Sequence, residues 1–199
     1  MRALILAAVL TIPSPLIIPS ASMAQDNQAL ATELGETIRS ESADSGHSVG
    51  YGVATAVFEA PADRVMRAIT DYANYKDFLP RFRQSRVLSQ RGRNALVYMQ
   101  ASAMRGTVTI WANMRIYARR PQGETQILEG RMVEGNLDKF TARWEVTPLD
   151  TERCIVRFRI LTEPQLPVPD SMVTSENVSI ARRSVRGLRR HVQHERYQN

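Results

Sequence analysis

The sequence predicts an α+β domain in which a curved antiparallel sheet of seven strands wraps around one long C-terminal helix, with an apolar cavity between them. Seven short segments between residues 49 and 163 alternate apolar and polar residues or are rich in β-branched ones, and short turns separate most of them. The last segment has an apolar residue at every third or fourth position, which is typical of a helix. A curved sheet cannot lie flat on a single helix, so we expect space between the two.

The first 24 residues have the pattern of a secretory signal that is cleaved after Ala24. Arg2 precedes an apolar run, and small residues surround the expected cleavage site. The alternative is an uncleaved membrane anchor, but three prolines interrupt the run before it reaches the ~20 residues that a spanning helix needs. We therefore expect an exported protein, either periplasmic or secreted.

Residues 25–48 are polar and are expected to form an N-terminal arm outside the core. Leu30, Leu34 and Ile38 lie four positions apart, which predicts a short amphipathic helix. The serine-rich residues 40–48 that follow are expected to be a flexible linker.

The predicted domain comprises residues 49–195, and residues 196–199 form a tail. A first strand at residues 49–58 precedes a helix with Pro61 at its first position. Six further strands are predicted at residues 83–90, 94–103, 107–118, 125–133, 138–148 and 154–163. Alternation in these strands places apolar side chains on one face, and we expect that face to turn toward the final helix.

The segment TDYANYKDFLP at residues 70–80 interleaves aromatic and charged residues. We expect it to join the first helix to the second strand and to close one end of the sheet with its aromatic side chains. Asp71 is expected to cap this turn by accepting main-chain N–H bonds, and Pro80 is expected to end it. The prediction is therefore a structural role, not a catalytic one.

The composition argues against several classes of function. The net charge of +6 is a modest basic balance that does not predict a nucleic-acid partner. Cys154 is the only cysteine, so no intramolecular disulfide can form, and its position in a strand predicts a small buried hydrophobe. Nucleotide-binding, hydrolase and zinc-protease motifs are missing. His191 and His194 could share a helix face, but they have no nearby cysteine and no clear carboxylate partner beyond Glu195. We therefore predict no catalytic residue, no metal site and no cofactor.

Two motifs follow the predicted order of elements: A-P-x-x-x-V at residues 60–65 and D-x-x-x-Y-x-x-F-L-P at residues 71–80. Together with Ser85-Arg86-Val87 and with GNLDKFTARWEVTPLD at residues 135–150, they resemble the START-like polyketide cyclase and coenzyme Q-binding protein family over residues 49–195. The resemblance implies a helix-grip fold and a protein that binds apolar molecules such as quinones and other lipids. It also implies an alternative, because some relatives catalyse polyketide cyclisation or dehydration.

The expected cavity is lined by aliphatic, aromatic and methionine side chains, which suits an apolar ligand such as a lipid, quinone or isoprenoid. The residues predicted to contact this ligand are Met99, Ile110, Met114, Phe140, Trp144, Phe158, Val178 and Val185. The residues predicted to lie at a possible entrance are Tyr72, Met104 and Arg131.

The alternative function is an enzyme that acts on an aromatic or polyketide-type substrate. Such an enzyme would need polar groups that converge inside the cavity, for example Arg131 with Glu129. The predicted inward faces offer almost no ionisable group, so the sequence favours binding over catalysis.

A band of arginines on the final helix lies well away from its apolar stripe. One interpretation is a solvated helix face. The other is that Arg183, Arg186 and Arg190 attract an anionic membrane surface or an acidic partner.

Overall fold

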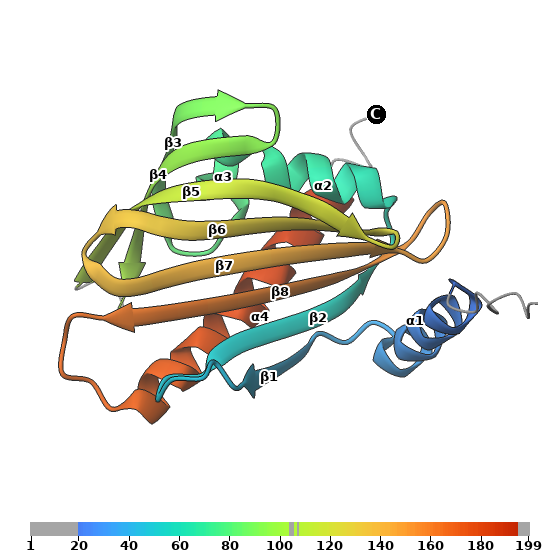
Figure 1. Cartoon of the computed structure of the whole chain (residues 1–199), viewed down its shortest axis with the longest axis horizontal. Helices are drawn as coiled ribbons and strands as arrows, with labels where there is room; N and C mark the ends of the chain where they lie inside the picture. The colour runs from blue at the N-terminus through green and yellow to red at the C-terminus, as the bar shows by residue number, and fades with distance from the viewer. Residues whose placement is uncertain (1–19, 104–105, 107, 195–199) are drawn as a thin grey trace, which may run out of the picture.

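The computed structural model describes residues 20–103, 106 and 108–194. In this part of the chain an eight-stranded antiparallel sheet curves around helix α4 (Figure 1). The elements are α1 (Ser20–Leu34), β1 (Arg39–Ala43), β2 (Tyr51–Phe58), α2 (Ala62–Thr70), η1 (Tyr72–Asn74), α3 (Tyr75–Phe78), β3 (Phe82–Arg91), β4 (Asn94–Ala103), β5 (Val108–Gln122), β6 (Thr125–Gly135), β7 (Leu137–Pro148), β8 (Cys154–Pro164) and α4 (Asp170–His194). This arrangement confirms the predicted fold class.

The strand order is β1-β2-β8-β7-β6-β5-β4-β3, and every neighbouring pair is antiparallel. The last six strands form a meander, whereas β2 pairs with β8, the strand most distant from it in the sequence. The three short helices α2, η1 and α3 connect β2 to β3 and lie on the same side of the sheet as α4 (Figure 1). The sheet therefore encloses α4 with its concave face.

The eighth strand, β1, lies in the segment that was predicted to be a linker. Its main chain pairs with β2, from Arg39 opposite Thr55 to Ala43 opposite Tyr51. Four of its five residues, RSESA, are polar and none is fully buried, so no alternating apolar pattern marks this strand in the sequence. Main-chain hydrogen bonds hold an edge strand on one side only, and any residue except proline can make them. The linker prediction is wrong for this strand, and the sheet has eight strands instead of seven.

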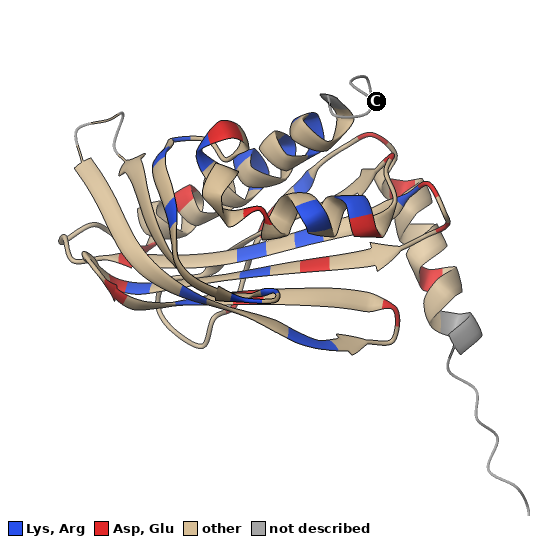
Figure 2. Ribbon diagram, turned by 90° about the horizontal axis from the view of Figure 1, so that it is seen from above, with Lys and Arg blue, Asp and Glu red and all other residues tan. Residues whose placement is uncertain are grey.

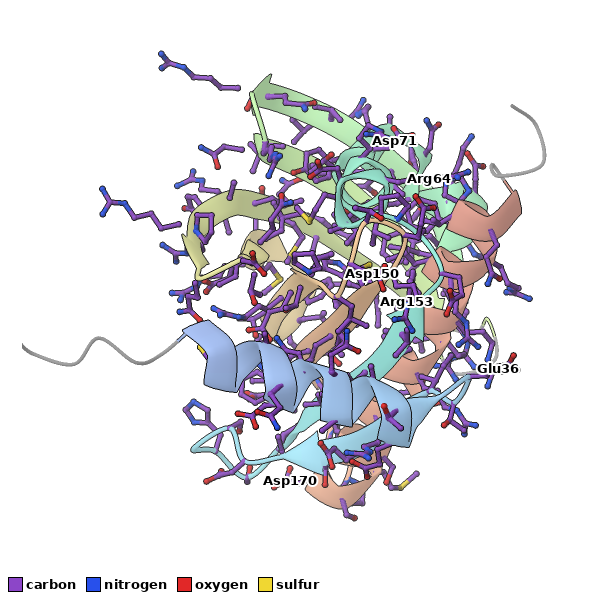
Figure 3. All side chains as sticks on the ribbon, turned by 90° about the vertical axis from the view of Figure 1, so that its right-hand side faces the viewer. Glu36, Arg64, Asp71, Asp150, Arg153 and Asp170 are labelled. Atoms are coloured by element: carbon purple, nitrogen blue, oxygen red, sulfur yellow. The ribbon has the colours of Figure 1, made fainter. Side chains whose placement is uncertain are left out.

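Helix α1 lies at one end of the sheet, close to the end of β2 (Figures 1 and 3). It packs through a small apolar cluster formed by Leu30, Ala31, Leu34, Val57 and Ile155. The predicted signal segment lies mostly outside the described residues, and its C-terminal part begins α1. None of the helices in the described part of the chain is long and apolar enough to cross a membrane.

The concave face of the sheet carries the main core, as the alternation predicted. Its almost fully buried residues include Val97, Met114, Val146 and Val156. Trp144 and Phe158 lie opposite each other on β7 and β8, and their rings stack with centroids 4.0 Å apart. Burial, helped by the nearby charge of Asp150, raises the pKa of the Cys154 thiol to about 12. Cys154 is therefore a buried hydrophobe at neutral pH, as expected.

Two glycines allow α4 to approach its neighbours closely. A Cβ atom on Gly52 of β2 would lie 2.0 Å from the main-chain oxygen of Asn177. A Cβ atom on Gly187 of α4 would lie 2.1 Å from the main-chain oxygen of Phe78. No side chain fits at such distances, so β2 meets the N-terminal half of α4 at Gly52, and α3 meets the C-terminal half at Gly187.

Asn177 is fully buried and fixes the N-terminal half of α4 to β8 and to the start of β2. Its Oδ1 accepts hydrogen bonds from the main-chain N–H (3.2 Å) and the hydroxyl (2.6 Å) of Thr162. Its Nδ2 donates to the main-chain oxygens of Gly50 (3.2 Å) and Thr162 (3.3 Å). A buried polar side chain needs such partners, and here they set the position of the helix.

The aromatic segment at residues 70–80 has a structural role, as predicted. The hydroxyl of Tyr72 donates to the main-chain oxygen of Arg93 at 2.6 Å. The hydroxyl of Tyr75 donates to the main-chain oxygen of Ile69, also at 2.6 Å. Burial raises the pKa of Tyr72 to about 12 and the pKa of Tyr75 well above its ordinary value. Both tyrosines are therefore neutral hydrogen-bond donors that hold the segment together.

The prediction that the side chain of Asp71 caps this turn through main-chain N–H bonds is wrong. No main-chain N–H group bonds to its side chain. Its two carboxylate oxygens instead accept from the side-chain amide of Asn74, at 3.0 and 2.9 Å. Further along, the ring of Phe78 stacks on His191 of α4 with centroids 4.6 Å apart. The segment thus packs against the C-terminal half of α4.

Candidate functional site

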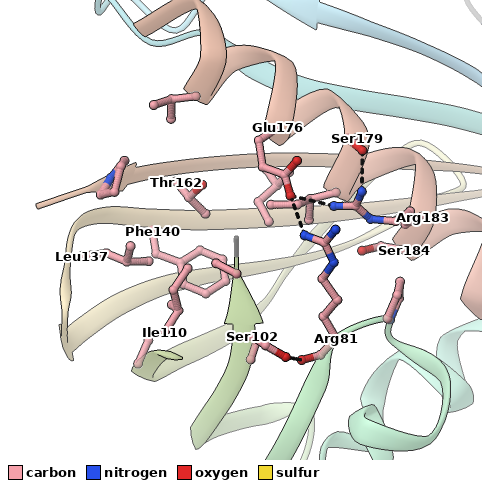
Figure 4. A pocket seen from close by; sticks show the side chains of 18 of the residues that line it. Arg81, Ser102, Ile110, Leu137, Phe140, Thr162, Glu176, Ser179, Arg183 and Ser184 are labelled. Atoms are coloured by element: carbon pink, nitrogen blue, oxygen red, sulfur yellow. Dashed lines mark hydrogen bonds and ion pairs between the residues drawn. The ribbon is translucent and has the colours of Figure 1, made fainter. Parts of the chain in front are cut away.

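A cavity of about 760 Å³ lies between the N-terminal half of α4 and the concave face of the sheet (Figure 4). Its volume is within the usual range for small-molecule sites. The strands contribute a mainly apolar wall formed by Met99, Ala101, Ser102, Ala103, Ile110, Ala112, Leu137, Phe140, Ile160, Thr162 and Pro164. The cavity is therefore suited to an apolar chain or ring.

Helix α4 forms the opposite wall, and many of its residues there are small or polar. They are Ser171, Met172, Val173, Ser175, Glu176, Ser179, Ile180, Arg183 and Ser184. Serine side chains leave space that leucine or phenylalanine would fill. In the C-terminal half of the helix, Val185, Leu188 and Val192 are at most 1% exposed and fill the core. The cavity thus lies beside the part of α4 that carries these four serines.

A smaller cavity of about 60 Å³ adjoins the first one deeper in the domain. The two cavities share the lining residues Phe82, Met99, Phe140, Ile160, Ile180 and Ser184. Beyond these, the lining consists almost entirely of core residues, including the stacked rings of Trp144 and Phe158. The site therefore becomes more apolar toward its inner end.

Three charged side chains meet at the mouth of the larger cavity (Figure 4). Glu176 Oε1 accepts hydrogen bonds from Arg81 Nη1 at 2.9 Å and from Arg183 Nη2 at 2.8 Å. Arg183 Nη1 also donates to Ser179 Oγ at 2.5 Å. The side chains of Arg81, Glu176 and Arg183 are 39%, 47% and 28% exposed. Water therefore screens this ion pair network in part, while its inner side borders the apolar cavity.

The predicted contact residues on the strands all line a cavity. Met99, Ile110 and Phe140 line the larger one. The smaller one is lined by Met114, Trp144 and Phe158, together with Met99 and Phe140.

The two contact residues predicted on α4 do not line either cavity. Val185 is buried in the core, and the main-chain nitrogen of Val178 lies close to Gly52 of β2. They lie elsewhere because the apolar stripe of α4 packs against the sheet and the core. The cavity lies beside a neighbouring face of the helix, on which serines and charged residues predominate.

The residues predicted to lie at the entrance are not brought to either cavity in the described part of the chain. Tyr72 is 1% exposed, donates to the main-chain oxygen of Arg93 and lines neither cavity. Arg131 is exposed and pairs with Glu129 at 2.7 Å, and neither residue lines a cavity. The third predicted entrance residue, Met104, lies outside the described residues.

The charged groups at the mouth were missed because no sequence pattern brings them together. Arg81 and Glu176 are 95 positions apart, and Arg183 was assigned to the outward band of α4. One local signal exists at Arg81, which follows Pro80 in a turn closed by a hydrogen bond from Phe82 N to Leu79 O (3.3 Å). Its φ of 68° lies in the left-handed region that glycine or asparagine usually occupies.

The described residues contain no group of histidine, cysteine or acidic side chains that could hold a metal ion. The pair proposed for an enzyme, Arg131 with Glu129, lies outside the cavities, where Glu129 also binds Arg119 at 2.9 Å. Burial alone would raise the pKa of Glu129, but the hydrogen bonds from Arg131 and Arg119 outweigh it and lower the pKa. Glu129 is therefore held in ion pairs on the outside of the sheet, away from both cavities.

The sheet, the long helix and the cavity between them agree with one family of proteins. The family "Polyketide cyclase / dehydrase and lipid transport" matches residues 58–189, which is more than half of the chain. The chain belongs to this family. The resemblance found in the sequence is thus confirmed, and the family is one whose description includes lipid transport. A search of the curated proteins finds no match.

Solved structures share the fold at low sequence identity. A START superfamily protein from Mycobacterium smegmatis is 17% identical with a TM-score of 0.64, covering 72% of this chain and 97% of that one. A STAR-related lipid transfer protein from Xanthomonas axonopodis is 14% identical with a TM-score of 0.66, covering 78% and 91%. Human StAR-related lipid transfer protein 5 is 11% identical with a TM-score of 0.63, covering 88% and 97%. At these identities the similarity concerns the fold alone.

Proposed function

We propose that the protein binds and carries an apolar small molecule, such as a lipid, quinone or isoprenoid, in the cavity between the sheet and α4. The observation that supports this proposal most directly is the cavity of about 760 Å³, with a mainly apolar strand wall. Transfer of about 300 Å² of apolar ligand surface into such a site contributes roughly 7.5 kcal/mol, before the cost of immobilising the ligand is subtracted. This is enough for useful affinity without any covalent step.

Binding is favoured over catalysis because of the position of the charged groups. A cyclase or dehydratase needs an acid or base beside the reacting atoms, inside the cavity. In the described part of this site, the carboxylate of Glu176 lies at the mouth and is engaged by two guanidinium groups. The inner end of the site is lined mostly by hydrocarbon, aromatic and methionine side chains.

We further propose that the protein acts after export, where the basic side of α4 attracts an anionic membrane surface. Arg182, Arg186 and Arg190 are exposed on this helix, and Figure 2 shows basic residues repeated along it. Arg183 no longer belongs to this group, since it pairs with Glu176. If Arg186→Glu/Arg190→Glu sediments with phosphatidylglycerol vesicles as well as the unchanged protein does, the membrane proposal fails.

The carrier proposal is tested by mass spectrometry of small molecules extracted from protein purified from its natural source. We expect an apolar molecule in near-stoichiometric amount. The matched variants are Ala101→Trp, which fills the cavity, and Ala118→Trp, which adds the same side chain at an exposed position of β5. Only Ala101→Trp is expected to lose the molecule. Retention of the molecule by both variants would place it elsewhere and overturn the proposal.

A further inference from the structure

Two arginines share one carboxylate at the mouth of the cavity. Arg81 and Arg183 both donate to the same oxygen of Glu176, at 2.9 and 2.8 Å (Figure 4). These three groups carry a net charge of +1. The other mouth residues on α4 that contribute polar groups are serines, which carry no charge. The mouth therefore has an excess of one positive charge next to an apolar space.

The position of Arg81 does not depend on the ion pair. The turn that contains Arg81 packs against α4, because Gly187 allows the main-chain oxygen of Phe78 to approach closely. The main-chain oxygen of Arg81 also accepts a hydrogen bond from Ser102 N at 2.9 Å. These contacts hold the main chain of Arg81 beside α4 without the help of the ion pair, so its side chain starts from a fixed point at the cavity mouth.

The backbone at Arg81 adds an independent observation. Its φ of 68° is unfavourable for a residue with a Cβ atom, by about 1 kcal/mol relative to glycine. The preceding proline and the positive φ are the signature of a type II turn, whose third position favours glycine or asparagine. An arginine at this position sacrifices some stability, and its guanidinium group lies at the cavity mouth. This combination indicates that the side chain has a function there.

We propose that the carried molecule is an amphiphile with one anionic group, a carboxylate or a phosphate, which Arg81 and Arg183 bind at the mouth while its apolar part occupies the cavity. This inference rests on the proposed function. The two guanidinium groups already hold a carboxylate oxygen, that of Glu176, so their spacing suits such a group. Glu176 then competes with the ligand for the same donors and keeps its affinity low enough for release.

Other ligand charges fit this mouth less well. A cationic headgroup would meet two guanidinium groups for one carboxylate. A neutral headgroup would leave the network of Arg81, Glu176 and Arg183 as it is, and would gain little from it. Only an anion uses the excess positive charge.

The test compares palmitic acid with hexadecan-1-ol, which have the same chain length but differ in headgroup charge. Each displaces the neutral fluorescent probe N-phenyl-1-naphthylamine from delipidated full-length protein at pH 8. We expect the acid to bind about tenfold more tightly than the alcohol. Hexadecyl phosphate, as a third ligand, distinguishes a phosphate site from a carboxylate site.

Three variants assign the preference to the mouth. Arg183→Gln and Arg81→Gly should each weaken palmitate several-fold and leave hexadecan-1-ol unchanged. Arg81→Gly should also keep or raise the melting temperature, because glycine tolerates the positive φ. Glu176→Gln should tighten palmitate binding, since the competing carboxylate is gone. The control is Arg157→Gln, an exposed arginine on β8 outside the cavities, which should change neither ligand.

The outcomes separate the two proposals. Equal binding of acid and alcohol, or weaker palmitate binding in Glu176→Gln, overturns the anionic ligand and leaves the apolar carrier intact. If the probe binds but neither amphiphile displaces it, this inference alone is overturned. If the probe itself does not bind, the carrier proposal fails and this inference fails with it.

Discussion

Along α4, the residues up to Ser184 and the residues from Val185 onward meet the same sheet in different ways. The first part borders the large cavity with short or charged side chains, and a buried asparagine holds it in place. The second part buries Val185, Leu188 and Val192 among core residues and packs against the aromatic segment. The difference teaches that one helix can both stabilise the domain and leave room for a ligand, provided that the two tasks are separated along its length.

The largest expected effect is on the packed half. Leu188→Ala removes a fully buried side chain and should lower the free energy of unfolding by about 3 kcal/mol, because the core cannot fully close the space left behind. Urea denaturation measures this change. Met172→Ala in the first half, where the side chain is 62% exposed, should change it by less than about 0.5 kcal/mol. Similar losses of unfolding free energy in Leu188→Ala and Met172→Ala would show that the two halves of α4 do not differ in their contribution to stability.

A smaller loss of unfolding free energy is expected at Asn177, which anchors the half of α4 that borders the cavity. Asn177→Ala leaves polar groups of Thr162 and Gly50 buried without their partner and should cost about 1–3 kcal/mol. Ser175→Ala, two positions before the anchor and exposed, serves as the control. Hydrogen exchange should show faster opening of the first half of α4 in Asn177→Ala only. Unchanged exchange would mean that other contacts hold this half.

The smallest effect on stability is expected in the cavity wall itself. Ser184→Leu adds apolar volume to a space that is empty without ligand, so the free energy of unfolding should stay within about 1 kcal/mol or rise. Binding of N-phenyl-1-naphthylamine should fall at the same time. Val185→Ser, at the next position, should instead lower the free energy of unfolding, because Val185 is part of the core. A loss of more than about 2 kcal/mol in Ser184→Leu would indicate a wall that is already tightly packed.

The inward faces of the strands could be predicted because alternation along a strand depends on local geometry alone. Met99, Ile110 and Phe140 were found in this way, and all three line the cavity. The edge strand β1 could not be predicted, since its main-chain pairing leaves no pattern in the side chains of RSESA.

The sequence by itself determined the family, the curved sheet with its inward faces, and the apolar stripe of the last helix, because periodicity and local motifs encode them. Only the tertiary structure decided which face of α4 borders the cavity. That face depends on how closely Gly52 and Gly187 let the helix approach its neighbours. The tertiary structure also brought Arg81 to Glu176 and Arg183, since contacts between residues 95 positions apart follow from packing and not from spacing.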